Sequence, residues 1–344
     1  MISCAIKSYE PGFNQPSVEP SQPSLPYRGN YDVLVGTRRY ASTTPAAKKS
    51  SNIPLFFLTG GVVGLATYIY LDRARKHEPI QEKSPFDPQN FVDFKLKKII
   101  PYNHNTSTFV FEIPNNEASL LPVASCLVVK ASDPEALKDA KGKPVIRPYT
   151  PISSPDHKGD FSLLIKKYET GNASKYIHEL KEGDTLSFKG PIAKFPYKAN
   201  EFDEVALIGG GSGITPLYQV LTHALSDKTN KTKFKLLFSN VTEQDILLRE
   251  DLDALQKKYP DNLDVVYLVD KPGSNWTGPS GFINTDIIKK HVAPASLGDK
   301  VKVFVCGPPG QVAAVAGKKA GMKQGEIGGI LKELGYTEDQ VYKF

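Results

Sequence analysis

The chain has 344 residues, 40% of them hydrophobic and 23% charged, which is enough for two folded domains and an additional segment. The net charge of +6 is scattered, and no basic patch is interleaved with aromatic residues, so nothing indicates a nucleic-acid partner. The cysteines are Cys4, Cys126 and Cys306, too few for an iron–sulfur cluster and without metal-ligand spacing, so we expect no metal site.

Residues 1–50 are rich in Pro, Ser, Asn and Thr and lack periodicity, which predicts a disordered or processed leader. The sequence RRYAS at 38–42 is typical of the cleavage region of a mitochondrial presequence. Glu10, Glu19 and Asp32 are unusual in such a presequence, and a wrongly assigned start is the alternative. We expect the leader to direct the chain to the mitochondrion.

Residues 53–71, IPLFFLTGGVVGLATYIYL, carry no charge and approach the ~20 residues that cross a bilayer. Lysines precede the segment, arginines follow it, and Tyr68 and Tyr70 stand where an interfacial aromatic belt would lie. The alternatives are a buried core helix, which would have nothing to pack against here, and a signal-peptide core, which would start nearer the N-terminus. We predict one transmembrane helix, followed by a polar linker at 72–86.

Residues 87–198 alternate in hydrophobicity at 91–96, 108–113, 161–166 and 184–191, with Pro, Gly and Asn between these runs. Repeated short strands with such turns predict an antiparallel β-barrel, interrupted by a short helix at 174–180.

Residues 203–344 instead alternate strands with helices. The strands are expected at 204–208, 234–238, 263–269 and 302–306, with helices at 216–225 and 248–258. This order predicts an α/β domain whose doubly wound parallel sheet carries helices on both faces. The alternating residues 339–344 resemble a closing strand.

The glycine run GGGSGITP at 209–216 joins a predicted strand to a predicted helix. Its glycines would let backbone approach a pyrophosphate, with Thr215 as the N-cap and Pro216 at the first helical position. The alternative is a plain strand-to-helix turn, because Ile214 replaces the third glycine of the G-x-G-x-x-G fingerprint.

Three further segments are candidates for ligand contacts. The run 147–150, Arg-Pro-Tyr-Thr, combines a cation, a ring and a hydroxyl, and Gly171-Asn172-Ala173-Ser174 opens a predicted helix that can hold a diphosphate. Cys306 ends a predicted strand, where open α/β sheets bind ligands; with no histidine nearby, we expect a packing and positioning residue and not a nucleophile. Residues 239–245 contain two acids and no cation, which favours NADH over NADPH.

In their order and spacing, RPYTPIS at 147–153, the segment 171–174, GGGSGITP, CGPPG at 306–310 and the terminal Phe344 resemble the cytochrome b5 reductase family of the ferredoxin reductase superfamily. The resemblance covers residue 87 to the C-terminus, and the leader and anchor add a likeness to mitochondrial fungal members. It implies FAD and NADH as cofactors, and cytochrome b5 or a similar haem protein as the electron acceptor.

The resemblance also implies roles for single residues. Thr150 would lie near the flavin N5, Tyr149 against the isoalloxazine, Cys306 beside the nicotinamide and Phe344 where the nicotinamide stacks, while Asp270 would favour NADH. The FAD side is implied to comprise Arg147, Pro148, Tyr149, Thr150, Ser153, Ile165, Lys166, Tyr168, Gly171, Ala173 and Ser174, with Thr170, Asn172 and Ala173 departing from the usual Gly-Gly/Gly-Lys-Met-Ser pattern. The NADH side is implied to comprise Gly210, Gly211, Ser212, Thr215, Asp270, Cys306, Gly307, Pro308 and Phe344.

The implied location is the mitochondrial outer membrane, with a processed intermembrane-space form and the endoplasmic reticulum membrane as alternatives. Three other functions stay open at this point: a flavin oxidoreductase with another acceptor, a non-enzymatic dinucleotide-binding protein, and a membrane adaptor.

Overall fold

The computed structural model describes residues 83–344. The predictions for the leader, the transmembrane helix at 53–71 and residues 72–82 of the linker lie outside the described residues. Between residues 83 and 344, no helix is both long enough and apolar enough to cross a membrane.

The first sheet is antiparallel, and its strands follow the order β4-β3-β6-β1-β2-β5. The strands are β1 (Val92–Asn103), β2 (Thr106–Glu112), β3 (Ser125–Ala131), β4 (Arg147–Tyr149), β5 (Asp160–Lys166) and β6 (Thr185–Ala193), with η1 (Pro114–Asn116) and α2 (Asn172–Glu179) between them. Beyond β4, the backbone N–H of Ile152 donates to the carbonyl of Ser162 in β5 at 2.9 Å, so one hydrogen bond links the segment after β4 to the outer strand β5. The predicted antiparallel β domain is confirmed.

Phenylalanine rings fill the interior of this sheet. Phe109 and Phe111 in β2 are fully buried because alternate residues of a strand point to the same face. The Phe111 ring meets Phe188 of β6 edge to face, with centroids 4.8 Å apart, and stacks on Phe161 of β5. This core fixes the strands whose ends carry Tyr149 and Lys166.

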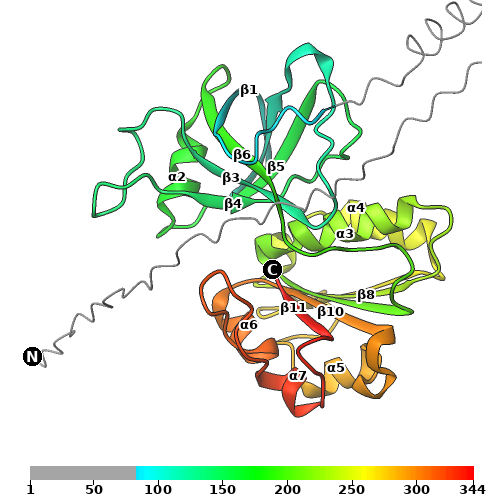
Figure 1. The fold of residues 1–344 in the computed structure, drawn as a ribbon. Helices are drawn as coiled ribbons and strands as arrows, with labels where there is room; N and C mark the ends of the chain where they lie inside the picture. The colour runs from blue at the N-terminus through cyan, green and yellow to red at the C-terminus, as the bar shows by residue number, and fades with distance from the viewer. Residues whose placement is uncertain (1–82) are drawn as a thin grey trace, which may run out of the picture. The chain divides into compact units, whose positions relative to one another are not determined.

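The second sheet is parallel, with strand order β11-β10-β7-β8-β9. Its strands are β7 (Glu204–Gly210), β8 (Lys233–Asn240), β9 (Leu263–Val269), β10 (Val301–Cys306) and β11 (Val341–Lys343). Helices α3 (Ile214–Ser226) and α4 (Arg249–Lys258) cover one face, and α5 (Thr285–His291), α6 (Pro309–Ala316) and α7 (Gly329–Glu333) cover the other (Figure 1). The 3₁₀ segments are η2 (Gly211–Gly213), η3 (Glu243–Asp245) and η4 (Ala295–Lys300).

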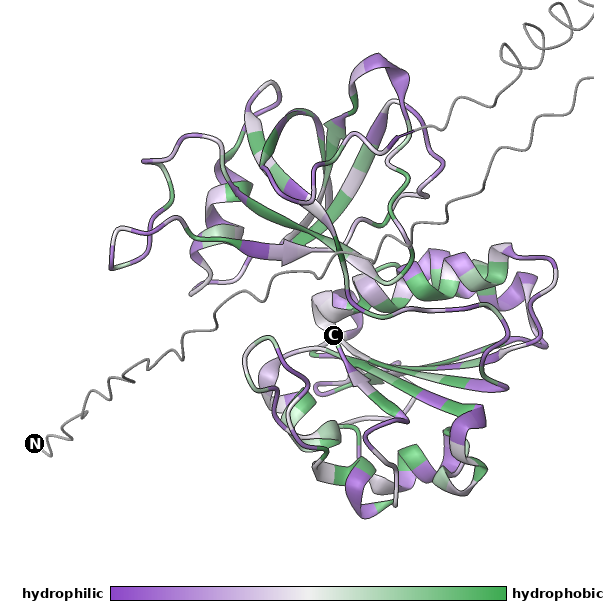
Figure 2. Ribbon diagram, in the orientation of Figure 1, coloured by the Kyte–Doolittle hydropathy of each residue, from purple (hydrophilic) through white to green (hydrophobic). Residues whose placement is uncertain are grey.

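Strand β7 shows why both faces are covered. Val205 and Leu207 belong to the core beneath α3 and α4, whereas Ala206 and Ile208 belong to the core beneath α5, α6 and α7. A strand buried on both faces is a continuous hydrophobic run, and the helices around it carry hydrophobic and hydrophilic residues together (Figure 2). The predicted doubly wound α/β domain is confirmed.

The start of α3 differs from the prediction. The 3₁₀ turn η2 leads directly into a helix that begins at Ile214, so the N-cap is Gly213 and not Thr215. The Thr215 hydroxyl instead donates to the carbonyl of Ser212 at 3.3 Å. The prediction for Thr215 as N-cap was wrong because continuous turns carry the chain from strand to helix.

Candidate functional site

A cavity of about 480 Å³, called here the central cavity, lies where β4, β5 and α2 of the antiparallel domain face the ends of β7, β10 and β11. Thirteen residues implied by the sequence line it: Pro148, Tyr149, Thr150, Ile165, Lys166, Tyr168, Ser174, Ser212, Thr215, Cys306, Gly307, Pro308 and Phe344. They come from six segments that are separate in the chain, and the fold gathers them at one place.

A second cavity of about 580 Å³, called here the Asp270 cavity, lies at the carboxyl ends of β7, β8 and β9. Gly210, Gly211 and Asp270 line it, and Lys166, Tyr168 and Pro308 line both cavities. The two cavities therefore lie side by side and share a wall.

Several buried polar atoms at the Asp270 cavity have no hydrogen-bond partner among residues 83–344. Oδ1 of Asp270 and both amide atoms of Asn240 are buried and form no hydrogen bond within the described part of the chain. Burial raises the pKa of Asp270, and Lys271 opposes this only in part. Because unpaired buried polar groups are costly, these atoms fit a ligand that offers hydroxyl or amide groups.

Close backbone contact explains the glycine turn. A Cβ on Gly213 would overlap the backbone carbonyl of Cys306, so the turn after β7 packs directly on the end of β10. Gly211 has a φ of +51° and open space around its α-carbon. The open space at Gly211 lets a ligand approach the backbone of the turn, as a phosphate site requires.

Gln311 in α6 joins two strand ends, and it was not predicted from the sequence. Its Nε2 donates to the carbonyl of Gly209 at 3.0 Å, and its Oε1 accepts from the Ser239 hydroxyl at 3.1 Å. Gln311 thus ties β7 and β8 to α6 at the wall of the Asp270 cavity.

Lys166 stands at the shared wall with a carboxylate beside it. Its Nζ lies 3.0 Å from Oδ1 of Asp245, and the two side chains are 15% and 8% exposed. Burial alone would raise the pKa of Asp245, but the hydrogen bonds from Thr242 and Lys166 outweigh burial, and the pKa is lowered. The ammonium is held in place before any ligand binds.

The two acids of the segment 239–245 pair with neighbouring side chains. Asp245 bonds Thr242 and Lys166, and Glu243 pairs with Arg249 at 2.6 Å. Neither belongs to the lining of the Asp270 cavity. The segment contributes Ser239, Asn240 and Val241 to that lining, none of them a cation, and Asp270 adds an acid there, so the argument for NADH from this segment stays a prediction.

Two side chains of the antiparallel domain shape the central cavity. Burial raises the pKa of Tyr149 to about 12, so its phenol is neutral. The Tyr168 hydroxyl lies 2.7 Å from that of Ser212, and the Tyr168 backbone N–H donates to the Ser174 hydroxyl at 3.1 Å. The Ser174 hydroxyl in turn donates to the carbonyl of Gly171 at 3.0 Å, which stabilises the start of α2.

Cys306 is a neutral thiol. Burial raises its pKa to about 12, although Lys319 acts in the opposite direction. A thiol with such a pKa is a poor nucleophile at neutral pH, which supports a role in packing and positioning.

Four implied residues stand outside the lining of both cavities: Arg147, Ser153, Gly171 and Ala173. The Arg147 guanidinium is exposed and donates to the carbonyl of Ile146 at 2.8 Å. Ser153 lines a separate cavity against α3 and accepts a hydrogen bond from the Ser162 backbone at 3.0 Å. Their contacts with a cofactor stay predictions.

Residues without a sequence signal complete the central cavity. Among them are Cys126, Lys194, Lys319, Met322 and Tyr342. The Tyr342 hydroxyl donates to the carbonyl of Lys194 at 2.5 Å, which brings the C-terminal strand to the segment after β6.

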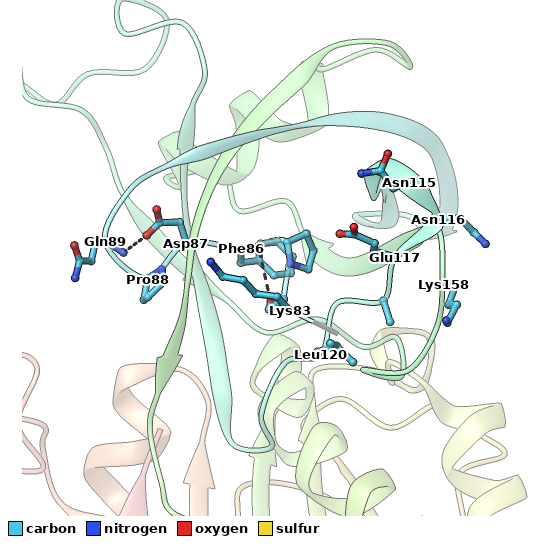
Figure 3. Close-up of a pocket in the computed structure, with 13 residues that line it drawn as sticks. Lys83, Phe86, Asp87, Pro88, Gln89, Asn115, Asn116, Glu117, Leu120 and Lys158 are labelled. Atoms are coloured by element: carbon cyan, nitrogen blue, oxygen red, sulfur yellow. Dashed lines mark hydrogen bonds between the residues drawn. The ribbon is translucent and has the colours of Figure 1, made fainter. Parts of the chain in front are cut away.

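A cavity of about 920 Å³ lies away from these residues, between the chain entering β1 and the loop after β2 (Figure 3). Its lining includes Phe86, Asp87, Asn115 and Glu117 and none of the implied site residues. Its size alone gives no reason to assign it a ligand.

An antiparallel β domain followed by a parallel α/β domain, with a ligand site at the junction of their strand ends, defines a two-domain oxidoreductase that binds two cofactors. Residues 93–197 match the family model of the oxidoreductase FAD-binding domain, and residues 207–317 match that of the oxidoreductase NAD-binding domain. The expected cofactor domains are confirmed.

The chain belongs to the NADH–cytochrome b5 reductase family. It is 46% identical over 326 residues to NADH-cytochrome b5 reductase 2 of Mycosarcoma maydis, covering 89% of this chain and 93% of the relative. It is 48% identical over 256 residues to the protein of the same name from Yarrowia lipolytica, covering 74% and 86%. Among solved structures, the cytochrome b5 reductase domain of Ulva prolifera nitrate reductase matches with a TM-score of 0.65 and 28% identity, over 76% of this chain and all of that domain.

Proposed function

We propose that this chain is an NADH-dependent flavin reductase that uses FAD and delivers electrons to cytochrome b5. The observation that carries the proposal is the pair of cavities with one shared wall, because the reaction needs a dinucleotide and a flavin in contact. The family membership, the FAD-binding domain and the NAD-binding domain support it.

The central cavity fits the flavin. It combines the Tyr149 ring and the Phe344 ring with polar atoms of Thr150 and Lys166. Tyr149, Thr150 and Lys166 would hold the ring system, and the start of α2 with Arg147 would hold the diphosphate. Bound FAD supplies the conversion between hydride transfer and single-electron transfer that this reaction needs.

The Asp270 cavity fits NADH. The unpartnered atoms of Asp270 and Asn240 would bond ligand hydroxyls and amides, and the turn at Gly210 and Gly211 would approach the diphosphate. A 2′-phosphate beside the Asp270 carboxylate would be repelled, so NADH is favoured over NADPH. Cys306 would fix the position of the nicotinamide, and its thiol stays protonated there.

The test is a visible absorption spectrum of the purified full-length chain. We expect a yellow protein that bleaches when NADH is added and recovers its colour when oxidised cytochrome b5 follows. A folded but colourless protein would refute the flavin, and a bleached protein that reduces ferricyanide but not cytochrome b5 would refute the acceptor.

We also propose that residues 53–71 anchor the chain in the mitochondrial outer membrane. The supporting observation is an uncharged segment of bilayer length between Lys48-Lys49 and Arg73. Carbonate extraction of isolated mitochondria should leave the full-length chain in the membrane pellet, with protease added outside intact mitochondria reporting its side. Recovery in the endoplasmic reticulum fraction would refute this location.

A further inference from the structure

Lys343, the next-to-last residue, is a buried cation outside the roles described above. The residue is 2% exposed, and its Nζ donates to the Glu326 carbonyl at 2.9 Å and shares its other N–H groups among the carbonyls of Ala316 at 3.4 Å, Gly325 at 3.4 Å and Lys318 at 3.5 Å. One ammonium therefore lies among carbonyl oxygens at the end of α6 and in the segment after it, and the Ala316 carbonyl also accepts from the Gly328 backbone N–H at 3.0 Å.

Three of these carbonyls, those of Lys318, Gly325 and Glu326, belong to the two arms of one loop, residues 317–328, and Ala316 directly precedes it. At its tip, Ala320 and Lys323 exchange backbone hydrogen bonds of 3.1 and 3.2 Å. Nearer its base, a Cβ on Gly325 would lie 2.5 Å from the Lys318 carbonyl, so the two arms touch. Both arms of the loop therefore contact the Lys343 ammonium through their backbone carbonyls.

Gln324 adds a second attachment to the same strand. Its Oε1 accepts from the Lys343 backbone N–H at 2.7 Å, and its Nε2 donates to the Lys343 carbonyl at 3.0 Å. Strand β11 thus holds the 317–328 loop through the side chain and the backbone of one residue.

The loop brings charge to the central cavity. Lys319 and Met322 line that cavity from the loop, and Met322 is 84% exposed at its edge. The residue after Lys343 is Phe344, whose ring lines the same cavity. Any displacement of the loop from β11 would move the Lys319 ammonium away from the cavity.

We propose that Lys343 is a positioning residue, which anchors the 317–328 loop to β11 and so keeps the Lys319 charge at the edge of the central cavity, where it attracts the anionic dinucleotide. The inference rests on the proposed use of NADH. An exposed charge at a cavity edge acts on association and is screened by salt, so its loss changes KM more than kcat.

The first experiment compares Lys343→Met with Lys332→Met in the full-length chain. Methionine keeps the length of the side chain and removes the charge and its donors, and Lys332 is exposed on α7 as the control. In Lys343→Met, amide hydrogen exchange in the 317–328 loop should accelerate about tenfold or more. The rest of the chain, and the whole of Lys332→Met, should exchange as the wild type. Unchanged loop exchange in Lys343→Met would overturn the anchoring role.

The second experiment is a double-mutant cycle on the KM for NADH. Lys343→Met and Lys319→Met should each raise KM on the order of fivefold at low salt with kcat within about twofold, an effect that shrinks at high salt. The double variant should add less than about twofold to either, because both changes remove the same contribution. Additive effects of the two substitutions on KM would overturn the proposal. So would an unchanged KM in a Lys343→Met protein whose loop exchanges faster, because Lys343 would then stabilise the loop without affecting NADH binding.

A further variant covers the case in which Lys343→Met does not fold. Gln324→Ala removes the second attachment without exposing a charge, and should accelerate exchange in the loop and raise KM in the same direction. No change in either quantity would refute the inference. A wild-type chain that does not oxidise NADH would refute the proposed function instead, while hydrogen exchange would still report the anchor.

Discussion

The buried ion pair between Lys166 and Asp245 should contribute more to the stability of the fold than an exposed ion pair does. It joins β5 of the antiparallel domain to η3 after β8, with 3.0 Å between Nζ and Oδ1. The replacement Asp245→Asn keeps the shape and an acceptor for Thr242 but leaves the Lys166 charge without its carboxylate. We expect a loss of stability well above that of a surface pair.

The magnitude follows from burial. Removing one partner of a buried pair costs about 3–5 kcal/mol, and a hydrogen bond to a charged group contributes about 1.5–3 kcal/mol. Lys166 is 15% exposed and faces two cavities, so water recovers part of the loss. We expect about 2–3 kcal/mol, or a thermal midpoint lower by roughly 5–10 °C for a folded unit of this size.

The assay is thermal unfolding between neutral pH and about pH 3, with Asp264→Asn as the control. Lys235 and Asp264 form a pair of similar length, 3.1 Å, whose side chains are 36% and 44% exposed, so its loss should cost less than about 1 kcal/mol.

The folded-state pKa of Asp245 is lowered, so its ionised form stabilises the fold above its unfolded pKa of about 3.9. That contribution is lost as pH falls through the folded pKa, and the gap between wild type and Asp245→Asn should close in acid. A difference in stability between wild type and Asp245→Asn that is equal at neutral pH and in acid would refute the reasoning. A difference no larger than that caused by Asp264→Asn would refute it as well.

Three further predictions concern the cavities. Asp270→Thr should lower the ratio of kcat/KM for NADH to kcat/KM for NADPH, by a factor that corresponds to about 1–3 kcal/mol. An unchanged ratio would place Asp270 away from the ribose. Cys306 should resist alkylation by iodoacetamide at neutral pH in the native chain and react after unfolding, because its pKa is raised to about 12; rapid native labelling, measured by mass spectrometry, would contradict this. Deleting Phe344 should change NADH and NADPH kinetics while leaving the flavin absorbance and the circular dichroism intact, and wild-type kinetics with both nucleotides would reject its role.

Hydrophobic periodicity predicted most of the fold because the residues buried in the core follow the same periodicity along the chain. Strand β2 alternates around Phe109 and Phe111, and β8 is buried on both faces. The elements that were not predicted, β3 and α5 to α7, are short or lack a clean period. For α5 a signal existed: Asn284 caps the helix by accepting from the Ile287 N–H at 3.0 Å, and Asp286 follows in the first turn.

The candidate site was predictable where motifs end strands, and not where tertiary contacts complete it. The glycine turn and Cys306 end neighbouring parallel strands, so the topology brings them together. Asp245 lies 79 residues from Lys166, and no local pattern relates the two. Gln311 and Lys319 likewise reach the cavities only through the placement of α6 and its following loop.

Several contacts between the two domains lie at the walls of the cavities, and this has a consequence for how ligands bind. Besides the ion pair at Lys166, the hydroxyls of Tyr168 and Ser212 meet at 2.7 Å, and Tyr342 donates to the carbonyl of Lys194 at 2.5 Å. Separating the domains would break these bonds, each worth about 0.5–1.5 kcal/mol, together with the stronger ion pair. The cavity walls are therefore set by the fold before ligands bind, and substitutions at this interface should change ligand affinity and stability together.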